Sequence, residues 1–304
     1  MSQVPASNHA APAGQPSASA MNVALCRAIA AHEPRDEIRG PDHLAEVFLD
    51  AAARQSLYDP AIHALILKKV TAFSPGTYEY FIARTAYLDA VVEQALRENI
   101  PQIVFLGAGY DTRACRFSHL IRETHLFELD ARATQQHKLS LLQKAGVAIP
   151  AQVTFVTVDF TSDSLADVLA RAGYAPNRRT LFVWEGVTYY LPPQAVEQTL
   201  AFIRQHAPAG SVLCFDYMIT IPEMGDRFGA KQARDAMRAI YSEEPLQFDL
   251  AEDQVAAFLA ERGFALLDHA TPETLQGRYL TLRDGSLAGQ MLDLFRLVQA
   301  TVVG

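Results

Sequence analysis

The sequence predicts an α/β protein with a mostly parallel, seven-stranded sheet that contains one antiparallel strand. Short apolar segments alternate with helical patterns over most of the chain after residue 99, and the first segment runs straight into a pair of glycines. Parallel neighbours need long crossover connections, so this alternation favours helices on both faces of the sheet. Of the 304 residues, 50% are hydrophobic and 20% are charged, which is typical of a globular protein.

Five apolar segments predict the parallel strands. They lie at residues 103–106, 125–129, 153–158, 180–184 and 211–215, with helical patterns between them at 131–145, 164–172 and 193–206. A helical pattern at 251–262 precedes two further predicted strands, 264–269 and 278–282. The connection between these two strands looks too short for a helix, which favours an antiparallel strand that closes the sheet.

Residues 21–98 are expected to form helices that contribute part of a lid, and residues 99–304 are expected to form the core. Apolar residues recur at helical spacing from His43 to Val70. The pattern is interrupted at Asp59-Pro60, where the proline suits the first turn of a second helix. A longer helical pattern follows at residues 78–98.

Residues 219–250 interrupt the alternation of strands and helices. They contain Pro222, Gly225 and Gly229, followed by a polar helical pattern near 230–240. We therefore expect an insertion that lies over the strand ends as the second part of the lid. Residues 1–20 are rich in Ala, Pro, Ser and Gly and lack the pattern of a secretory signal, so a disordered leader is expected there.

Charge and composition narrow the classes of partner and compartment. The net charge of −8 disfavours a nucleic acid or an anionic membrane as partner, and no apolar run reaches the ~18 residues that span a bilayer. Three scattered cysteines, Cys26, Cys115 and Cys214, predict reduced thiols, which suits a cytoplasmic protein. The histidines and cysteines show no metal-ligand spacing, so no metal is expected. The oligomeric state is left open.

A glycine turn, Gly107-Ala108-Gly109, follows the first predicted strand. Two glycines let the backbone turn tightly and approach a ligand at the carboxyl edge of the sheet. The carboxylate of Asp130 ends the second strand, at the separation expected for a residue that binds a ribose diol. Together these features predict a nucleotide-type cofactor site.

The residues after the turn favour one class of cofactor over another. A dinucleotide pyrophosphate site needs a third glycine, but Thr112 stands at that position, and Asp111 would approach the phosphates. At ~4 Å and an effective dielectric constant of ~20, each such like-charge contact costs about 4 kcal/mol. S-adenosylmethionine carries no phosphate and has a sulfonium and an ammonium group, so acids near the turn are compatible with it.

Two more acids follow strands at the same predicted edge. Asp159 follows the third strand and could accept from an adenine amino group, and Glu185 follows the fourth, where a methionine portion would lie. A single acid at a strand end is more often a turn former than a ligand. Three of them at successive strand ends, beside a glycine turn, favour a binding site.

The sequence resembles the leucine carboxyl methyltransferase-like family of S-adenosylmethionine-dependent O-methyltransferases, which includes many bacterial enzymes that act on small molecules. The matching segments are 57–60, Arg84 within 82–85, 106–113, 127–130, 158–160 and 185–191. The resemblance implies a Rossmann-like class I methyltransferase fold with S-adenosylmethionine as cofactor.

The resemblance also implies roles for individual residues. Arg84 would pair with the cofactor carboxylate, Gly107 would lie against its methionine part, and Asp130 would bind the ribose. Asp159 and Phe160 would bind the adenine, and Glu185 the ammonium group. The family has a further basic residue ahead of the Asp-Pro element, for which Arg54 is the nearby candidate.

The acceptor is predicted less sharply than the cofactor. Tyr189, Tyr190 and Tyr217 lie just past predicted strand ends and are candidates for lining an acceptor pocket. No Ser/His/Asp or His/Glu pair is evident, which suits a carboxylate acceptor because it is already ionised at pH 7. We expect O-methylation of a small-molecule carboxylate or hydroxyl, with the methyl ester favoured. A protein C-terminus, a nicotinamide-dependent oxidoreductase and a non-catalytic cofactor-binding protein are the alternatives.

Overall fold

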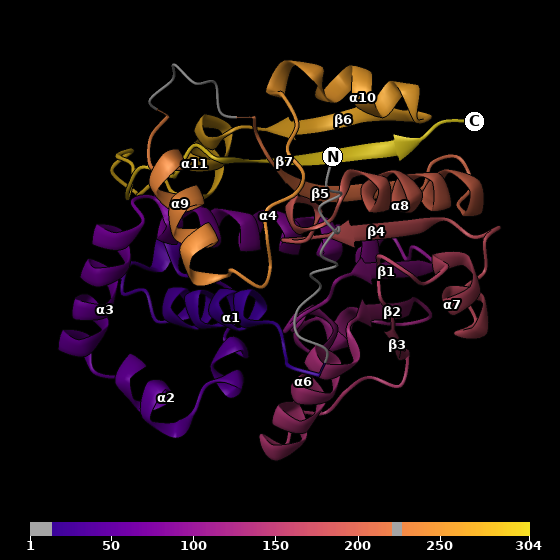
Figure 1. Ribbon diagram of the computed structural model, residues 1–304. Coiled ribbons are helices and arrows are strands. Elements are labelled where there is room, and N and C mark those ends of the chain that lie inside the picture. Colours follow the sequence, from indigo (N-terminus) through magenta and orange to yellow (C-terminus); the bar gives the residue numbers. More distant parts are fainter. Residues whose placement is uncertain (1–13, 221–226) are drawn as a thin grey trace, which may run out of the picture.

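The computed structural model describes residues 14–220 and 227–304, which are built around a seven-stranded sheet (Figure 1). The strand order is β3-β2-β1-β4-β5-β7-β6. The strands are β1 (Gln102–Leu106), β2 (His125–Asp130), β3 (Val153–Thr157), β4 (Thr180–Trp184), β5 (Val212–Met218), β6 (Phe264–Ala270) and β7 (Phe295–Val302). Neighbours from β3 to β5 are parallel, and β7 is antiparallel to both β5 and β6. The predicted sheet with one antiparallel strand is confirmed.

Helices connect the strands and cover both faces of the sheet. They are α1 (Ala18–Ala31), α2 (Ala51–Leu57), α3 (Pro60–Phe73), α4 (Thr77–Arg97), α5 (Arg113–Arg116), α6 (Arg132–Lys144), α7 (Leu165–Arg171), α8 (Pro193–His206), α9 (Ala230–Ile240), α10 (Val255–Glu261) and α11 (Pro272–Tyr279). Short 3₁₀ turns add η1 (Asp36–Ile38), η2 (Ala45–Phe48), η3 (Ser118–Leu120), η4 (Thr188–Tyr190) and η5 (Glu252–Gln254). α1, α4 and α11 pack on one face, and α7, α8 and α10 on the other.

The central strands are apolar along their whole length because both of their faces are covered. In β1, Ile103 and Phe105 join the core under α4, while Val104 and Leu106 join the core under α7 and α8. All five residues of β1 are buried. Such continuous apolar runs are typical of parallel strands, whose crossover helices lie on both sides of the sheet.

The predicted strand at residues 278–282 is wrong, and the link after β6 does contain a helix. Thr271 accepts a hydrogen bond from the backbone N–H of Thr274 through its side chain, Pro272 occupies the first turn, and α11 runs on to Tyr279. An N-cap threonine followed by proline is a strong helix start, and it overrides a five-residue apolar alternation. The strand that closes the pairing is β7, further along the chain.

The N-terminal helices also differ from the sequence prediction. The pattern from His43 to Val70 is divided once more, at Asp50, whose side chain caps α2. Residues 1–13 of the predicted leader lie outside the described residues. Its last residues are ordered, because Ser17 caps α1 and the helix begins at Ala18. The prediction of a disordered leader is therefore wrong for residues 18–20, which belong to α1.

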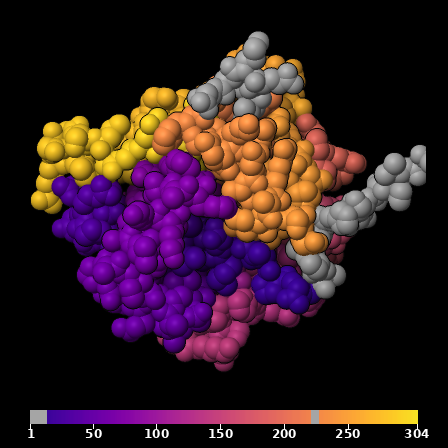
Figure 2. All heavy atoms as spheres, turned by 60° about the vertical axis from the view of Figure 1, so that its left-hand side comes forward, coloured from indigo at the N-terminus to yellow at the C-terminus, as the bar shows by residue number. Residues whose placement is uncertain are grey.

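The predicted insertion contains the expected helix. α9 spans Ala230–Ile240, as the polar pattern indicated, whereas Pro222 and Gly225 lie outside the described residues. Figure 2 shows the orange segment that includes α9 lying against the violet helices of the N-terminal part. In the described part of the chain, no helix is long and apolar enough to cross a membrane.

Candidate functional site

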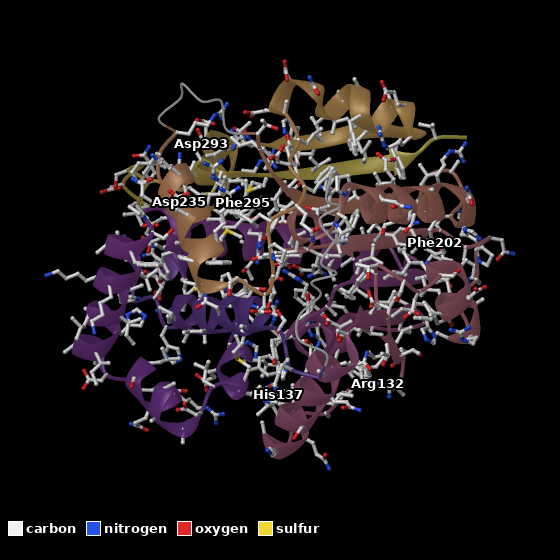
Figure 3. The ribbon with its side chains drawn as sticks, viewed as in Figure 1. Arg132, His137, Phe202, Asp235, Asp293 and Phe295 are labelled. Atoms are coloured by element: carbon white, nitrogen blue, oxygen red, sulfur yellow. The ribbon has the colours of Figure 1, made fainter. Side chains whose placement is uncertain are left out.

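A cavity of about 880 Å³ opens at the carboxyl ends of the parallel strands. Figure 3 shows two residues of its lining on opposite sides of the molecule's centre: Arg132 at the start of α6 and Phe295 at the start of β7. The cavity brings together most of the residues that the sequence singled out: Arg84, Gly107, Ala108, Gly109, Asp111, Asp130, Asp159, Phe160, Glu185, Tyr189 and Tyr190. Its size suits a cofactor together with a small second ligand.

The glycine turn forms the floor of this cavity. Gly107 has φ +73° and Gly109 has φ +51°, in the left-handed region that favours glycine. A Cβ on Gly107 would overlap Cγ2 of Val187, so the two segments can approach this closely only with glycine at that position. The N–H of Ala108 donates to the carbonyl of Leu129 at 2.8 Å, which fixes the turn against the end of β2.

Asp130 lies beside the turn with its carboxylate at the cavity wall. It accepts hydrogen bonds from the backbone N–H of Gly109 at 2.5 Å and of Ala131 at 2.7 Å. Burial raises the pKa of Asp130 to about 6, although these two N–H groups oppose the shift. The carboxylate is therefore ionised at pH 7.5 and titrates in a range that binding experiments can reach.

We predict that S-adenosylhomocysteine binds more weakly as the pH falls through 6. Protonation removes acceptor capacity from the carboxyl that is expected to bind the ribose, so affinity should drop by about tenfold between pH 7.5 and 5. Calorimetric titration across this range measures the effect. Asp130→Asn should bind weakly at every pH and lose the dependence, and an unchanged pH profile in that variant would assign the titration to another group.

Asp159 and Phe160 line the part of the cavity beyond Asp130. Asp159 Oδ1 accepts from the N–H and hydroxyl of Thr161, so this carboxylate stabilises its own turn. The side chain is exposed, and Phe160 is half-buried against the core. The turn-forming role and a ligand role are compatible, because a carboxylate oxygen can accept more than one hydrogen bond.

Arg84 lies at the centre of a buried ionic network. Its Nε is 2.9 Å from Glu185 Oε1, and its Nη1 is 3.0 Å from Asp216 Oδ2. Asp216 also accepts from the N–H of Gly186 at 2.6 Å and from the hydroxyl of Tyr80 at 2.7 Å. Within the described residues, Arg84 Nη2 has no hydrogen-bond partner, although the residue lines the cavity.

A second buried arginine, Arg113, pairs with the other carboxylate oxygen of Glu185. Arg113 Nη1 is 2.7 Å from Glu185 Oε2, Arg113 Nε is 2.7 Å from Asp89, and its backbone N–H donates to Asp111. Burial opposes ionisation of Glu185, but Arg113 and Arg84 outweigh it and hold the pKa of Glu185 below its usual value. Arg113 likewise overcomes burial and lowers the pKa of Asp111 to about 2. Both carboxylates are charged at neutral pH.

Arg113 and Asp216 belong to this network but were not predicted from the sequence, and the prediction for Tyr217 is wrong. β5 extends to Met218, so Asp216 and Tyr217 lie within the strand and point to opposite faces. Asp216 faces Arg84, whereas Tyr217 is buried in the core on the other face and shares a hydrogen bond with His269. Tyr217 is therefore removed from the candidate pocket. Arg54 binds backbone carbonyls of Glu46 and Val47 and is not part of the cavity lining either.

The first turn of α1 lies over the glycine turn and is held there by the insertion. A Cβ on Gly109 would come within 3.3 Å of Ala20, and the N–H of Ser17 donates to Thr134 of α6. Glu244 accepts hydrogen bonds from the N–H of Ala18 and from the hydroxyls of Ser17 and Ser19. A carboxylate at a helix N-terminus is favoured by the helix dipole. This contact joins two distant parts of the chain above the cavity.

We predict that Glu244→Gln speeds the release of S-adenosylhomocysteine. The amide loses the charge and one acceptor oxygen, which costs about 1–2 kcal/mol and corresponds to roughly five- to thirtyfold faster dissociation. Stopped-flow displacement measures the rate. Asp235→Asn is the control, because Asp235 is exposed and lies outside the cavity lining. Equal rates for the two variants would mean that the contact does not retain the ligand.

Comparisons with known proteins bear on this site. A family model described as leucine carboxyl methyltransferase matches residues 20–204. A Bacillus subtilis protein named as a candidate S-adenosyl-L-methionine-dependent methyltransferase, YktD, is 28% identical over 207 residues, which cover 68% of each chain. A Streptomyces avermitilis protein with the same description is 32% identical, over 84% of this chain and 85% of its own. A Thermobifida fusca structure solved as a candidate methyltransferase has a TM-score of 0.60 and 16% identity, with 96% of each chain covered.

Proposed function

Because the chain belongs to the leucine carboxyl methyltransferase family and is an S-adenosylmethionine-dependent methyltransferase, we propose that it methylates an acidic oxygen of a small molecule, with a carboxylate as the favoured acceptor. The family assignment removes the nicotinamide-dependent alternative. The other acceptors to be weighed are a hydroxyl and a protein C-terminus.

The cavity suits the cofactor in the charge and position of its polar groups. Glu185 Oε1 forms an ion pair with Arg84 Nε at 2.9 Å but accepts no hydrogen bond among the described residues, so an ammonium group could donate one to it. Arg84 Nη2 would receive the carboxylate, Asp130 would accept from the ribose, and Asp159 with Phe160 would hold the adenine. S-adenosylmethionine, when bound, supplies an electrophilic methyl group on a sulfonium.

One observation carries the preference for a carboxylate acceptor. Among the described residues, the cavity lining includes no histidine and no lysine. Burial raises the pKa of Tyr80 and Tyr189 well above the usual value, so these hydroxyls hold their protons. Several carboxylates line the cavity. Asp111 and Glu185 are paired with arginines, and Asp130 accepts from two backbone N–H groups. An acceptor that is already ionised at pH 7, such as a carboxylate, needs no base from the protein.

The residues of this chain would act by holding and enclosing the reactants. The Arg84–Asp216 pair anchors α4 to the Gly186 backbone and keeps Glu185 at the cavity wall. The ring of Tyr189 packs at a tilt against that of Phe295, with centroids 5.0 Å apart, and both residues line the side of the cavity next to β7. Exclusion of water from a carboxylate nucleophile raises its reactivity, and fixed geometry supplies the alignment.

The proposal is tested with methyl-labelled S-adenosylmethionine and a panel of matched acceptors. Each carboxylic acid is paired with the alcohol or phenol of the same skeleton, and a peptide with a free C-terminal carboxylate is included. We expect label in the acids. Label confined to alcohols and phenols would contradict the carboxylate preference, and label confined to the peptide would favour the protein C-terminus.

A further inference from the structure

One half of the cavity has an apolar lining that the cofactor residues do not explain. Most residues expected to bind the cofactor follow β1 to β4, and Arg84 joins them from α4. The rest of the lining comes from α1, α3, α4 and α9, and from the segments around η4, after α9 and before β7. We define the apolar chamber as the part lined by Val70, Phe73, Ala236, Met237, Ile240 and Leu292. Its occupant would lie next to the methyl-transfer site, within the same cavity.

α9 presents its apolar stripe to this chamber. Ala233 and Met237, like Ala236 and Ile240, are four residues apart, so the four residues share one side of the helix, and all of them line the cavity. The charged residues of α9 are not in the lining, including Asp235, which Figure 3 labels on this helix. An amphipathic helix normally buries such a stripe against the protein core, but this one borders a cavity.

Two large apolar side chains at the chamber remain accessible. Phe73 is 58% exposed and Ile240 is 55% exposed, and both line the cavity. The surrounding backbone is closely fitted: a Cβ on Gly229, which precedes α9, would overlap the carbonyl oxygen of Pro75, and Leu292 N donates to the carbonyl of Gly76. The chamber is thus enclosed by close backbone contacts among three segments that are distant in the chain: the link after α3, the start of α9 and the segment before β7.

We propose that the apolar chamber holds the hydrophobic body of the acceptor, so that the substrate is an amphipathic acid with an aliphatic or aromatic body and one carboxylate. The carboxylate in this inference rests on the proposed function, whereas the apolar body rests on the lining of the chamber alone. A hydrophobic body covers the α9 stripe and the exposed faces of Phe73 and Ile240. The carboxylate then lies towards the polar half, beside the cofactor site.

The inference is tested by chain length in straight-chain acids from acetic to dodecanoic acid. Affinity for the protein bound to S-adenosylhomocysteine, measured by calorimetry, should rise about fourfold per methylene until the chamber is full. Methyl-transfer rates at low acceptor concentration should follow the same order. Failure of dodecanoic acid to bind, or equal affinity for acetic and dodecanoic acids, would overturn the inference.

Two pairs of variants assign the effect to the chamber. Ala236→Phe fills it and should lower the transfer rate to dodecanoic acid by at least about tenfold while sparing propionic acid, whereas Ala239→Phe, on an exposed side of the same helix, should change neither. Phe73→Ala should weaken dodecanoic acid binding severalfold, whereas Leu65→Ala, also exposed on α3 but outside the lining, should not. An equal effect within each pair would overturn the assignment. All variants are first checked by thermal unfolding and S-adenosylhomocysteine binding.

The matched alcohols separate this inference from the proposed function. If the alcohols are methylated in order of chain length and the acids are not, the carboxylate acceptor is wrong and the apolar chamber is supported. If short polar acids or the C-terminal peptide are the best acceptors, the chamber inference is overturned, while methylation of a carboxylate stands.

Discussion

Arg84→Lys is expected to weaken S-adenosylhomocysteine binding by about ten- to a hundredfold while leaving 5′-methylthioadenosine binding unchanged. In the native network, the guanidinium contacts Glu185 and Asp216 from different nitrogens, and the residue lines the cavity. Lysine keeps the charge but cannot make all of these contacts at once. The loss corresponds to one charge-assisted hydrogen bond, about 1.5–3 kcal/mol. Calorimetry with the two ligands measures it.

5′-Methylthioadenosine is the control ligand for this prediction. It lacks the amino-acid part, so it cannot use the proposed contact to Arg84. A parallel loss for both ligands would show that Arg84 only supports the fold. Arg84→Ala should also destabilise the fold, because it leaves Glu185 and Asp216 buried without this counter-charge. Breaking a buried pair of this kind costs about 3–5 kcal/mol of unfolding free energy.

Gly107→Ala should lower the free energy of unfolding by about 3 kcal/mol and abolish measurable methyl transfer. The substitution meets two obstacles: φ is +73°, which costs an L-residue about 1–2 kcal/mol, and the new Cβ overlaps Val187, which adds about 1–3 kcal/mol of overpacking. Both effects displace the backbone that forms the cavity floor. Chemical denaturation and a labelled-methyl assay measure the two losses.

Two further variants separate strain from overlap at Gly107. Gly146 has a similar φ of +68° with no neighbour within 4 Å of a built Cβ, so Gly146→Ala should cost only about 1–2 kcal/mol and leave activity intact. Adding Val187→Ala to Gly107→Ala should recover part of the stability, because it removes the overlapping methyl groups. No recovery in the double variant would mean that strain at Gly107 accounts for the whole loss.

The regular part of the fold was predictable because each element carries its own local signal. β4 begins and ends at the predicted residues, Thr180 and Trp184, and α8 at Pro193 and His206. β4 is apolar on both faces, and α8 begins with a proline that marks its start. The C-terminal part carries a misleading local signal. The segment 278–282 alternates like a strand but belongs to the end of α11 and the loop after it. A cap at Thr271 decides the structure there.

The candidate site was predictable where its residues follow strands, and not where they depend on tertiary contacts. Asp130, Asp159 and Glu185 were identified because a strand end fixes their position. Asp216 was missed because it lies inside β5, where only the alternation of faces distinguishes it from Tyr217. Glu244 was missed because its partners, at the start of α1, lie more than two hundred residues away in the chain. No local pattern could reveal that contact.

The central claim is that this chain forms methyl esters, and the fate of the transferred methyl group tests it most directly. The best acceptor from the panel is incubated with the protein and methyl-labelled S-adenosylmethionine, and the purified product is treated with mild alkali. An ester releases its label as volatile methanol, and we predict that nearly all of the label is released in this way. Label that remains with the product after alkali would identify an ether and contradict the claim.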